Sequence, residues 1–547
     1  MFKRIILLFV GVLIFGCAEL SSNDSLPSFQ QALANQPGHD AKVIAHWNVV
    51  PFQTITTDFS IGVVAFHING IKRIDFQING GEIRSVEEMT INTRTDTYEY
   101  MIPIYYKDID TIGLKRNRIE VSAVIYPKGS GIPRKLEILP LNLKNSDFTQ
   151  ENIVWVSGKG NDDVGDGSKN NPYRQPKRAL QKLFELDRKE EKLSYSTIYL
   201  KEGEYVWGSN GYRSPVEGNR WVTISAAPGS NRAKVIFNTR NKDNFLPKLL
   251  KISGVTIDNI FFYPGSGKSS KLWIENSNII GPGPTVGRGF LYASNWSDIY
   301  FTNVDISNYP NGATSLSIAR NVKVNNIGSD AFSGTKLVVN SEVNGIDKRE
   351  TKFHPDVYQV YCNNKQLENY IVYGLIARNV KAQGIFSGGC KSLDNVAFVN
   401  VLIARPFASD PSKPFYSQWT VSSNHLVMSG LTLPNSALIF RTDDLKNVLV
   451  DGSVFYSLGI SLGKKNTTTW PEGVIFRNLH LIRPPRTKLS SGHFGITYGE
   501  ADFSDLSNND FSPNPGSPLR NRIDLPFTKI DIYSSKRDSL GSIGAIN

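Results

Sequence analysis

Short runs of alternating apolar and polar residues fill the chain from residue 42 to about residue 147, and this alternation is typical of strands that bury one face. The runs are FSIGVVAFHI, RIDFQING, TYEYMIPIYY and NRIEVSAVIY. They are rich in β-branched and aromatic residues and are separated by turn-forming segments such as NGG and PKGSG. The pattern predicts a small antiparallel β-sandwich over residues 42–147.

From residue 148 onward, short strands recur after an Asn or a small residue, as in YFTNVDI, VNNIGS, ARNVKA, FVNVLI, LVDGSVF and FRNLHL. The steps between these positions are 23, 53, 21, 53 and 25 residues, and each long step accommodates two units and an inserted loop; the positions are Asn303, Asn326, Asn379, Asn400, Ser453 and Asn478. A period in the twenties is typical of a solenoid whose coils pack only on their neighbours. We expect the asparagines to form side-chain ladders within the turns.

One segment has the 3.6-residue period of an amphipathic helix, with Ala179, Leu180, Leu183 and Phe184 on one side. It closes the stretch NIVWVSGKGNDDVGDGSKNNPYRQPKRALQKL, in which a strand, a Gly/Asp-rich loop, a proline and an aromatic residue precede the helix. The residues that stand in this order are Trp155, Gly160, Asp162, Gly167, Pro172 and Tyr173. A helix here would cover the apolar end of the first coil.

This order resembles the opening of right-handed parallel β-helix proteins of the pectate-lyase-like superfamily, many of which act on carbohydrates. The final segment, with its closing Ile-Gly-Ala, resembles the C-terminal pattern of the same superfamily. The 42–147 region resembles the immunoglobulin-like modules that accompany secreted carbohydrate enzymes. These resemblances imply an all-β fold, with a sandwich followed by a right-handed parallel β-helix over residues 148–547.

The N-terminus, MFKRIILLFVGVLIFGC, has a basic start, an apolar run and a cysteine, which is the order of an export signal. Its IFGC ending resembles the lipobox of bacterial lipoproteins, which implies cleavage after residue 16 and lipid attachment at Cys17. Residues 17–41 are small and polar and suit a tether. Because Ala18 replaces the aspartate that retains lipoproteins at the inner membrane, we expect an outer-membrane or cell-surface location.

The chain has 61 basic and 50 acidic residues, and removal of Lys3 and Arg4 with the signal leaves 59 against 50, a net charge of +9. An exported basic protein attracts acidic polymers, and we expect an acidic polysaccharide as the partner. The chain lacks a long Lys/Arg run, so we expect no nucleic-acid partner, and contact with the membrane only through the lipid. Cys362 and Cys390 either form a disulfide in an oxidising compartment or pack as free thiols.

The stretch KFHPDVYQVY holds the densest polar group of the strand-like segments. In a regular strand, alternate side chains share a face, which would group His354 with Asp356 and Tyr358. A bend after Pro355 would instead bring Gln359 to the same side. Polar residues this close together in a strand need partners or substrate to compensate for their desolvation, which makes them a candidate site.

Asp330 in NIGSDAF and Gln383 in NVKAQGIF each follow a ladder asparagine by four residues, so we expect them at equivalent positions in the coils. Stacked coils lie about 4.8 Å apart, so Asp330, His354 or Asp356, and Gln383 are predicted to form a polar column on an outer sheet. The longest inserted segments, at 343–372 and 404–425, flank this region and would form the walls of a groove.

Four further side chains are candidates. Lys336 is expected at the groove edge, where it would act as a base, and Arg441 is expected to hold a sugar acid or sulfate. The alternative for both Lys336 and Arg441 is that they are ordinary solvated surface residues. His425 is a candidate for substrate binding, or else bonds a backbone carbonyl. Tyr358 is expected to stack on a sugar ring.

Two reactions fit these residues. In β-elimination, His354 or Lys336 is the base, and Arg441 and Gln383 neutralise a uronate carboxylate. In hydrolysis, Asp330 and Asp356 form the carboxylate pair, and His354 tunes one of them. The basic charge favours elimination slightly, although motifs typical of alginate lyases and polygalacturonases are missing.

A noncatalytic glycan-binding solenoid is the third alternative. The loop GNDDVGDGS also offers Asp162, Asp163 and Asp166 as oxygen ligands. Calcium is therefore the one metal for which the sequence suggests a site.

Overall fold

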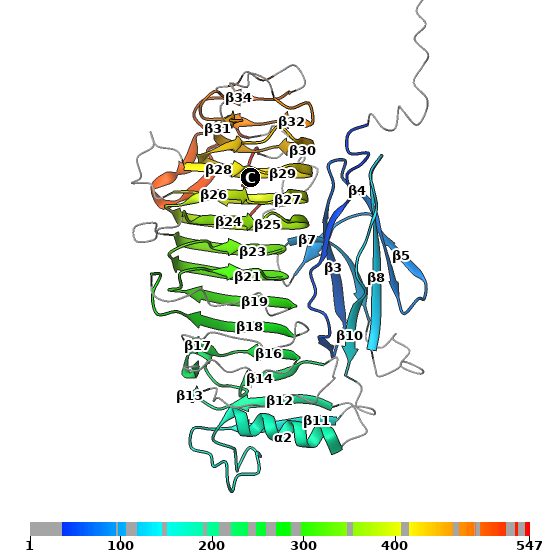
Figure 1. Cartoon of the computed structure of the whole chain (residues 1–547), viewed down its shortest axis with the longest axis vertical. Coiled ribbons are helices and arrows are strands. Elements are labelled where there is room, and N and C mark those ends of the chain that lie inside the picture. The colour runs from blue at the N-terminus through cyan, green and yellow to red at the C-terminus, as the bar shows by residue number, and fades with distance from the viewer. Residues whose placement is uncertain are drawn as a thin grey trace, which may run out of the picture.

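The protein, described by a computed structural model, is a β-sandwich that lies along the side of a long parallel β-helix (Figure 1). The structure describes residues 36–546 with gaps at 94–96, 106–117, 145–149, 190–193, 207–219, 239–247, 259–269, 286–296, 347–353, 406–414, 463–469, 486, 488, 490–492, 521–530 and 534–541. The export signal, Cys17 and most of the expected tether therefore lie outside the described residues. Within the described part, no helix is both long and apolar enough to cross a membrane.

The sandwich consists of two sheets that enclose an apolar core. One sheet has the order β1-β3-β7-β6 and the other the order β2-β10-β8-β4-β5, with β9 paired to β8. Core side chains such as Val63 on the first sheet and Phe76 and Val121 on the second meet between them. The strands are β1 Ile44–Trp47, β2 Thr54–Ile55, β3 Phe59–Phe66, β4 Ile71–Ile78, β5 Ile83–Val86, β6 Thr90–Asn92, β7 Thr97–Ile104, β8 Arg118–Pro127, β9 Arg134–Lys135 and β10 Leu139–Leu143.

The β-helix is a 24-stranded parallel sheet wound into stacked coils, which confirms the predicted fold class. Its strands are β11 Gln150–Val156, β12 Ser194–Leu200, β13 Gly203–Val206, β14 Val222–Ala226, β15 Val235–Asn238, β16 Leu249–Ser253, β17 Thr256–Asp258, β18 Lys271–Ile280, β19 Asp298–Ser307, β20 Ala313–Thr314, β21 Ile318–Ile327, β22 Phe332–Ser333, β23 Leu337–Ile346, β24 Asp356–Tyr361, β25 Gln366–Val380, β26 Gln383–Gly388, β27 Ser392–Ile403, β28 Phe415–Trp419, β29 Ser423–Phe440, β30 Leu445–Asp451, β31 Val454–Ile460, β32 Val474–Arg477, β33 His480–Leu481 and β34 Thr497–Tyr498.

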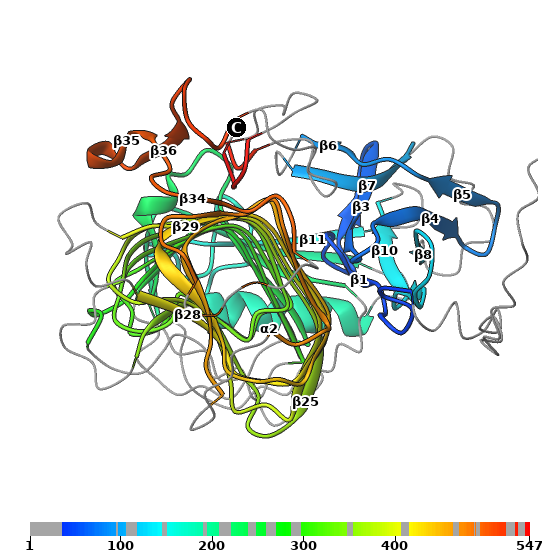
Figure 2. The same ribbon diagram turned by 90° about the horizontal axis from the view of Figure 1, so that it is seen from above.

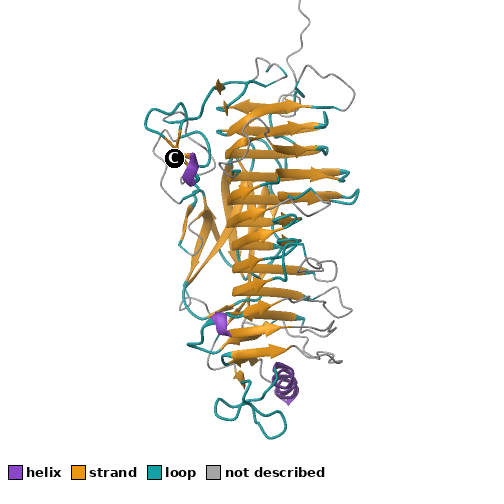
Figure 3. Cartoon of the chain, turned by 90° about the vertical axis from the view of Figure 1, so that its left-hand side faces the viewer, coloured by secondary structure: helices purple, strands orange, loops and turns teal. Residues whose placement is uncertain are grey.

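A single α-helix among the described residues, α2 (Pro176–Lys189), lies at the first coil, against β11 and β12 (Figure 3). Its apolar side, with Ala179, Leu180, Leu183 and Phe184, is buried in the same core cluster as the inward side chains of the first strands. Short 3-10 helices, η3 (Arg232–Lys234) and η6 (Leu506–Asn508), lie in connections. The helix thus removes from water the apolar end that the first coil would otherwise expose.

Each coil turns at columns of residues in the left-handed backbone conformation, which Gly and Asn adopt most readily. One column, aligned by strand register, contains Asn276, Asn303, Asn321, Asn340, Gly374, Asn400, Gly430, Gly452 and Asn478. A second contains Asn308, Asn326, Gly345 and Asn379. The expected equivalence of Asn303 with Asn326 is therefore wrong, because the two asparagines stand at different corners of the coil.

The asparagines also form hydrogen-bonded ladders between coils. Asn303 donates through Nδ2 to Oδ1 of Asn276 at 2.9 Å, and its own Oδ1 accepts from Nδ2 of Asn321 at 3.0 Å. In the second column, Asn326 donates to Asn308 at 2.6 Å. Asn303 therefore uses both ends of its amide in the ladder while it holds the turn that its backbone requires.

The sandwich packs on the outer side of one β-helix face, as the view down the coils shows (Figure 2). Apolar residues of the sandwich, such as Val64 and Phe66, share a buried cluster with outward residues of the coils, among them Tyr373, Val399 and Val427. The phenyl ring of Phe66 meets the ring of Tyr373 edge-on at 5.6 Å. This face is therefore apolar on both its inner and its outer side.

A third column of left-handed residues, Asn369, Asn395, His425 and Asn447, joins the β-helix to the sandwich. Asn369 accepts from the backbone N–H of Ala45 and donates to its carbonyl, both at 2.9 Å, which satisfies the free edge of β1. His425 bonds the carbonyl of Lys42 at 2.9 Å. Bends that shape the coil thus also supply the groups that hold the sandwich.

The C-terminal segment returns over a second face of the β-helix. Phe511, which lies in the hairpin of β35 (Phe503–Asp505) and β36 (Asp510–Pro513), packs with Leu402, Ala545 and Ile546. The N–H of Ala545 donates to Oγ1 of Thr432 at 2.9 Å. The closing Ile-Gly-Ala therefore covers coils that lie more than a hundred residues earlier in the chain.

Cys362 and Cys390 form a disulfide, which decides between the two alternatives that the sequence left open. It links the residue after β24 to the residues after β26, on the coils that carry the candidate site described below.

The left-handed turn at Asn303 makes a testable contribution to stability. Asn303→Gly keeps the backbone conformation and loses the ladder bond, whereas Asn303→Ala loses the bond and also pays about 1–2 kcal/mol for a left-handed Cβ. We expect the alanine variant to unfold at a lower temperature and urea concentration than the glycine variant. Equal midpoints would show that the ladder bond, rather than the backbone, carries the contribution of Asn303.

Candidate functional site

Asp330, Asp356 and Gln383 lie at the same corner of successive coils, where the strands of one face begin. Asp356 is the first residue of β24 and pairs in register with Gln383, the first residue of β26. The backbone N–H of Asp356 donates to Oδ1 of Asp330 at 3.1 Å, and the N–H of Ala331 donates to the carbonyl of Asp356 at 2.9 Å. The structure thus brings together the polar column that the sequence predicts.

Asp356 is the centre of the group. Its side chain is 0% exposed, and its Oδ2 lies 3.2 Å from Nδ1 of His354 and 3.2 Å from Nε2 of Gln359. The His354 side chain is 49% exposed, so the imidazole joins the buried carboxyl to the solvent. Oδ1 of Asp356 is buried and accepts no hydrogen bond from any described residue.

The backbone at Pro355 explains this arrangement. Its carbonyl accepts from the N–H of Gln383 at 2.9 Å, and β24 starts only at the next residue. Gln359 therefore turns to the side of Asp356, as the bent alternative required, whereas Tyr358 points into the coil. The His354 ring is held from the next coil by the ring of Phe386, which it meets edge-on at 5.0 Å.

The two carboxyl groups have strongly perturbed acidities. Burial raises the pKa of Asp330 to about 7, although the N–H of Asp356 opposes the shift. Burial also raises the pKa of Asp356 to about 8, and the nearby Asp330 carboxyl adds to the shift, because two like charges cannot easily share the site. Near neutral pH this pair therefore retains a proton, which a pair of exposed aspartates would have lost.

Two predicted substrate-binding residues are buried elsewhere. Tyr358 is fully buried, and its hydroxyl donates to the carbonyl of Thr335 at 2.8 Å, so it belongs to the core of the coil. His425 is also fully buried, against the sandwich, where it bonds Lys42 and accepts from the N–H of Ile68 at 2.9 Å. The predictions of substrate contact for both residues are wrong, and for His425 the alternative of a carbonyl bond holds.

Two predicted basic residues lie away from the cluster. Gly334 turns the chain directly after β22, so Lys336 stands beyond that corner, in a cleft that faces the sandwich. Arg441 follows the last residue of β29, and the register places it at the far ends of the strands that begin with Asp356 and Gln383. Neither lies with the carboxyl pair, which contradicts the role of base for Lys336 beside Asp330.

Gln418 and Phe386 belong to the site and were not among the predicted residues. Gln418 donates through Nε2 to Oε1 of Gln383 at 3.2 Å and follows Phe386 and Gln359 in one column of the face. All are partly exposed. The long insertion before β28 prevents the register of Gln418 from being counted along the sequence. The only sequence signal for this residue is the alternation of apolar and polar residues in FYSQW, which predicts that Gln418 faces outward.

The Asp-rich loop has structural partners. Asp162 accepts from the N–H groups of Arg174 and Gln175, at 2.8 and 3.0 Å, just before α2. Asp166 accepts from the N–H of Ser168, and these bonds lower its pKa. In the described residues, no group of three His, Cys, Asp or Glu side chains is arranged to hold a metal ion.

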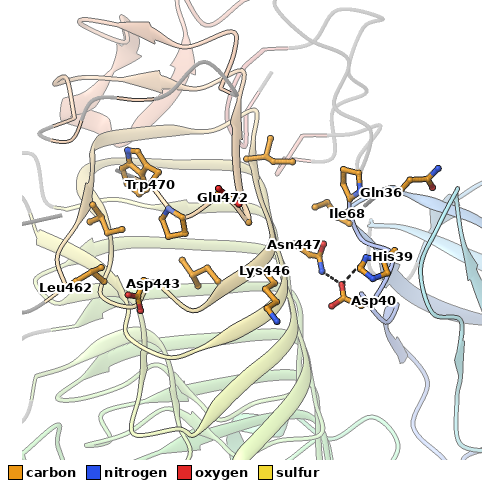
Figure 4. Close-up of a pocket in the computed structure, with 16 residues that line it drawn as sticks. Gln36, His39, Asp40, Ile68, Asp443, Lys446, Asn447, Leu462, Trp470 and Glu472 are labelled. Atoms are coloured by element: carbon orange, nitrogen blue, oxygen red, sulfur yellow. Dashed lines mark hydrogen bonds and ion pairs between the residues drawn. The ribbon is translucent and has the colours of Figure 1, made fainter. Parts of the chain in front are cut away.

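A cavity of about 830 Å³ lies elsewhere on the protein and contains none of these residues. It lies between the segment 36–40 and the late coils, where Asn447 donates to the carboxyl group of Asp40 (Figure 4). Trp470 and Glu472 line the opposite wall. The end of the expected tether is thus packed against the β-helix instead of standing free.

No family model matches the chain, and no curated protein sequence matches it. Among solved structures, the chain is similar to the family 28 exopolygalacturonase of Yersinia enterocolitica, with 11% sequence identity and a TM-score of 0.30. The match covers 87% of this chain and 100% of the other. At this identity and TM-score, the likeness carries no argument about function.

The raised pKa values predict how stability changes with pH. Both carboxyls bind protons more tightly when folded than at their unfolded pKa of about 3.9, so folding is favoured at low pH and this contribution is lost as pH rises from about 4 to about 8. We expect Asp356→Asn to lose less stability over this range than the wild type. Each proton retained gives a slope of about 1.4 kcal/mol per pH unit.

Urea unfolding of the two proteins at several pH values would measure the difference. Asp305→Asn, at an exposed carboxylate on another face, serves as the control and should follow the wild type. Parallel pH curves for the wild type and Asp356→Asn would contradict the assignment of a retained proton.

Proposed function

We propose that this protein degrades a polysaccharide by hydrolysing glycosidic bonds at the cluster of Asp330, His354 and Asp356. The observation that carries the proposal is the contact between the half-exposed imidazole and a fully buried carboxyl group whose pKa is raised to about 8. A proton store next to an exposed imidazole is what acid–base catalysis near neutral pH needs.

Hydrolysis requires one group that protonates the leaving oxygen and another that assists the attacking water. His354 is suited to the first role, because Nδ1 contacts Asp356 and the rest of the ring extends toward solvent. Asp356 orients the ring through the contact between its Oδ2 and Nδ1 of His354. Asp330, which is partly exposed, supplies the second group.

Hydrolysis fits these contacts better than β-elimination. An eliminating enzyme needs cationic or amide groups that neutralise the uronate carboxylate beside the proton that leaves. Among the described residues, no Lys or Arg side chain bonds to Asp330, His354 or Asp356, and the perturbed pKa values have no cationic cause. The amides of Gln359 and Gln383 are the remaining neutralising groups, and they support elimination as the second candidate reaction.

An acidic polysaccharide remains the proposed substrate, because of the net charge of +9 after removal of the signal. The proposed location is the outer membrane or cell surface, with Cys17 as the lipid attachment point, which would place the β-helix where large extracellular polymers are accessible. Phe386 lies beside His354 on the exposed face and offers an aromatic surface to a sugar ring.

The test starts with purified protein that lacks residues 1–35 and a panel of anionic polysaccharides. We expect new reducing ends without the ultraviolet absorbance of an unsaturated uronate. On the cleaved polymer, His354→Ala and Asp330→Asn should each lower kcat by about 10²–10⁴-fold, the usual contribution of general acid–base catalysis. Asp305→Asn should leave kcat unchanged.

Other outcomes identify the alternatives. Growth of unsaturated-uronate absorbance would replace hydrolysis by elimination, with His354 as the base. Binding to glycans without any cleavage would support a noncatalytic solenoid. Full turnover in both His354→Ala and Asp330→Asn would remove the cluster from the mechanism.

A further inference from the structure

A cleft at the junction of the sandwich and the β-helix has the size and lining of a binding site. Its volume is about 390 Å³, within the range of about 300–1,000 Å³ usual for small-molecule sites. Its principal side chains come from both parts of the protein: His46, Trp47 and Arg134 from the sandwich, and Tyr300, Lys336 and Glu368 from the coils. The cleft is separate from the carboxyl pair, because Lys336 stands beyond the corner at Gly334.

Basic groups converge in this cleft. Arg134 is 7% exposed, donates through Nε to the carbonyl of Val43 and pairs through Nη2 with Glu368 at 3.1 Å. Its Nη1 makes no hydrogen bond to a described residue. The ammonium group of Lys336 likewise has no ion pair or hydrogen bond among the described residues, although it is close enough to lower the pKa of His46, as Arg134 also does.

The acids in the cleft are already engaged. Glu368 binds Arg134 and also accepts from Nδ2 of Asn395 at 2.9 Å. Asp298 pairs with Lys271 and accepts from Ser317 at 2.8 Å. Lys135 and Glu137, one of each charge, are both exposed at the rim. Among the described residues, the charge of Lys336 is therefore left without a partner, and the buried guanidinium group of Arg134 keeps one edge free.

We propose that this cleft binds an anionic saccharide unit, either a uronate or a sulfated sugar. Lys336 and the free edge of Arg134 hold the anionic group, because a guanidinium and an ammonium are the natural donors to carboxylate and sulfate. The half-buried indole of Trp47 provides the apolar surface for the ring of the sugar.

The pKa of His46 depends on whether an anion occupies the cleft. Its Nε2 lies 2.6 Å from the carbonyl of Asn369, so Nε2 carries the proton and Nδ1 is the unprotonated nitrogen of the neutral ring. Burial, Lys336 and Arg134 together lower the pKa of His46 to about 4, while the Asn369 carbonyl opposes the shift. A bound anion cancels part of the positive field, so it must raise this pKa, and by linkage its affinity must rise as pH falls toward this pKa.

The inference does not rest on the proposed hydrolysis. A second attachment point on the same molecule would hold a polymer near the protein whether or not the carboxyl pair reacts with it, because linked contacts raise the effective concentration. The two proposals can therefore fail separately.

The experiment titrates the protein without residues 1–35 with sodium glucuronate, glucose 6-sulfate, inorganic sulfate and glucose at constant ionic strength. Calorimetry measures affinity, and NMR of the His46 ring measures its pKa. We expect saturable binding of glucuronate or glucose 6-sulfate, an increase in the pKa of His46, and no binding of glucose. Inorganic sulfate should bind at least tenfold more weakly than the charged sugars, because it lacks the ring.

Matched variants locate the site. Lys336→Gln should weaken binding at least tenfold, whereas Lys323→Gln, at an exposed lysine on another face, should bind as the wild type does. Absence of saturable binding, equal affinity in Lys336→Gln and the wild type, or equally tight inorganic sulfate would each overturn the proposal; unchanged unfolding midpoints would show that Lys336→Gln is folded.

Discussion

The structure depends on a backbone constraint, because every coil must turn at the same positions so that the next coil can lie in register on it. At these positions the chain adopts the left-handed conformation, which most L-residues avoid and which Asn and Gly tolerate. The sequence therefore repeats Asn or Gly at the corners, while the sides of the coil vary. Ladder bonds such as Asn303 to Asn276 are secondary to this backbone requirement.

The same constraint creates the candidate site. Because the corner at Asn326 and Asn379 is kept in register, the residues that follow it are stacked, and Asp330 meets Asp356 although they are distant in the chain. A corner places side chains at the limit of the packed interior. There a carboxyl group is desolvated enough to hold a proton, while a neighbour such as His354 still reaches water. The acid–base character of the site is thus a property of its position in the coil.

Much of this could be predicted from the sequence because it depends on local patterns. The strand alternation predicts the sandwich, the 179–184 stripe predicts the helix on the first coil, and the offset from each asparagine predicts the column of Asp330 and Gln383. Other features depend on contacts that no local pattern encodes. Asn303 and Asn326 look alike in sequence but occupy different corners. The register pairs Asn303 with Asn321 and Asn326 with Asn308, so the spacing between Asn303 and Asn326 does not correspond to one full coil. Tyr358 and His425 are polar enough to seem exposed, yet the coil interior and the docked sandwich bury them.

The apolar cluster around Phe66 and Tyr373 gives one wall of the β-helix no solvated side. The outward side chains of this sheet are buried, because the sandwich covers them. Separation of the two parts at residues 145–149 would leave a long strip of aromatic and aliphatic side chains in water, together with an unpaired strand edge at β1, and both favour aggregation. The sandwich and the coils therefore share a buried apolar interface that crosses the boundary visible in the sequence.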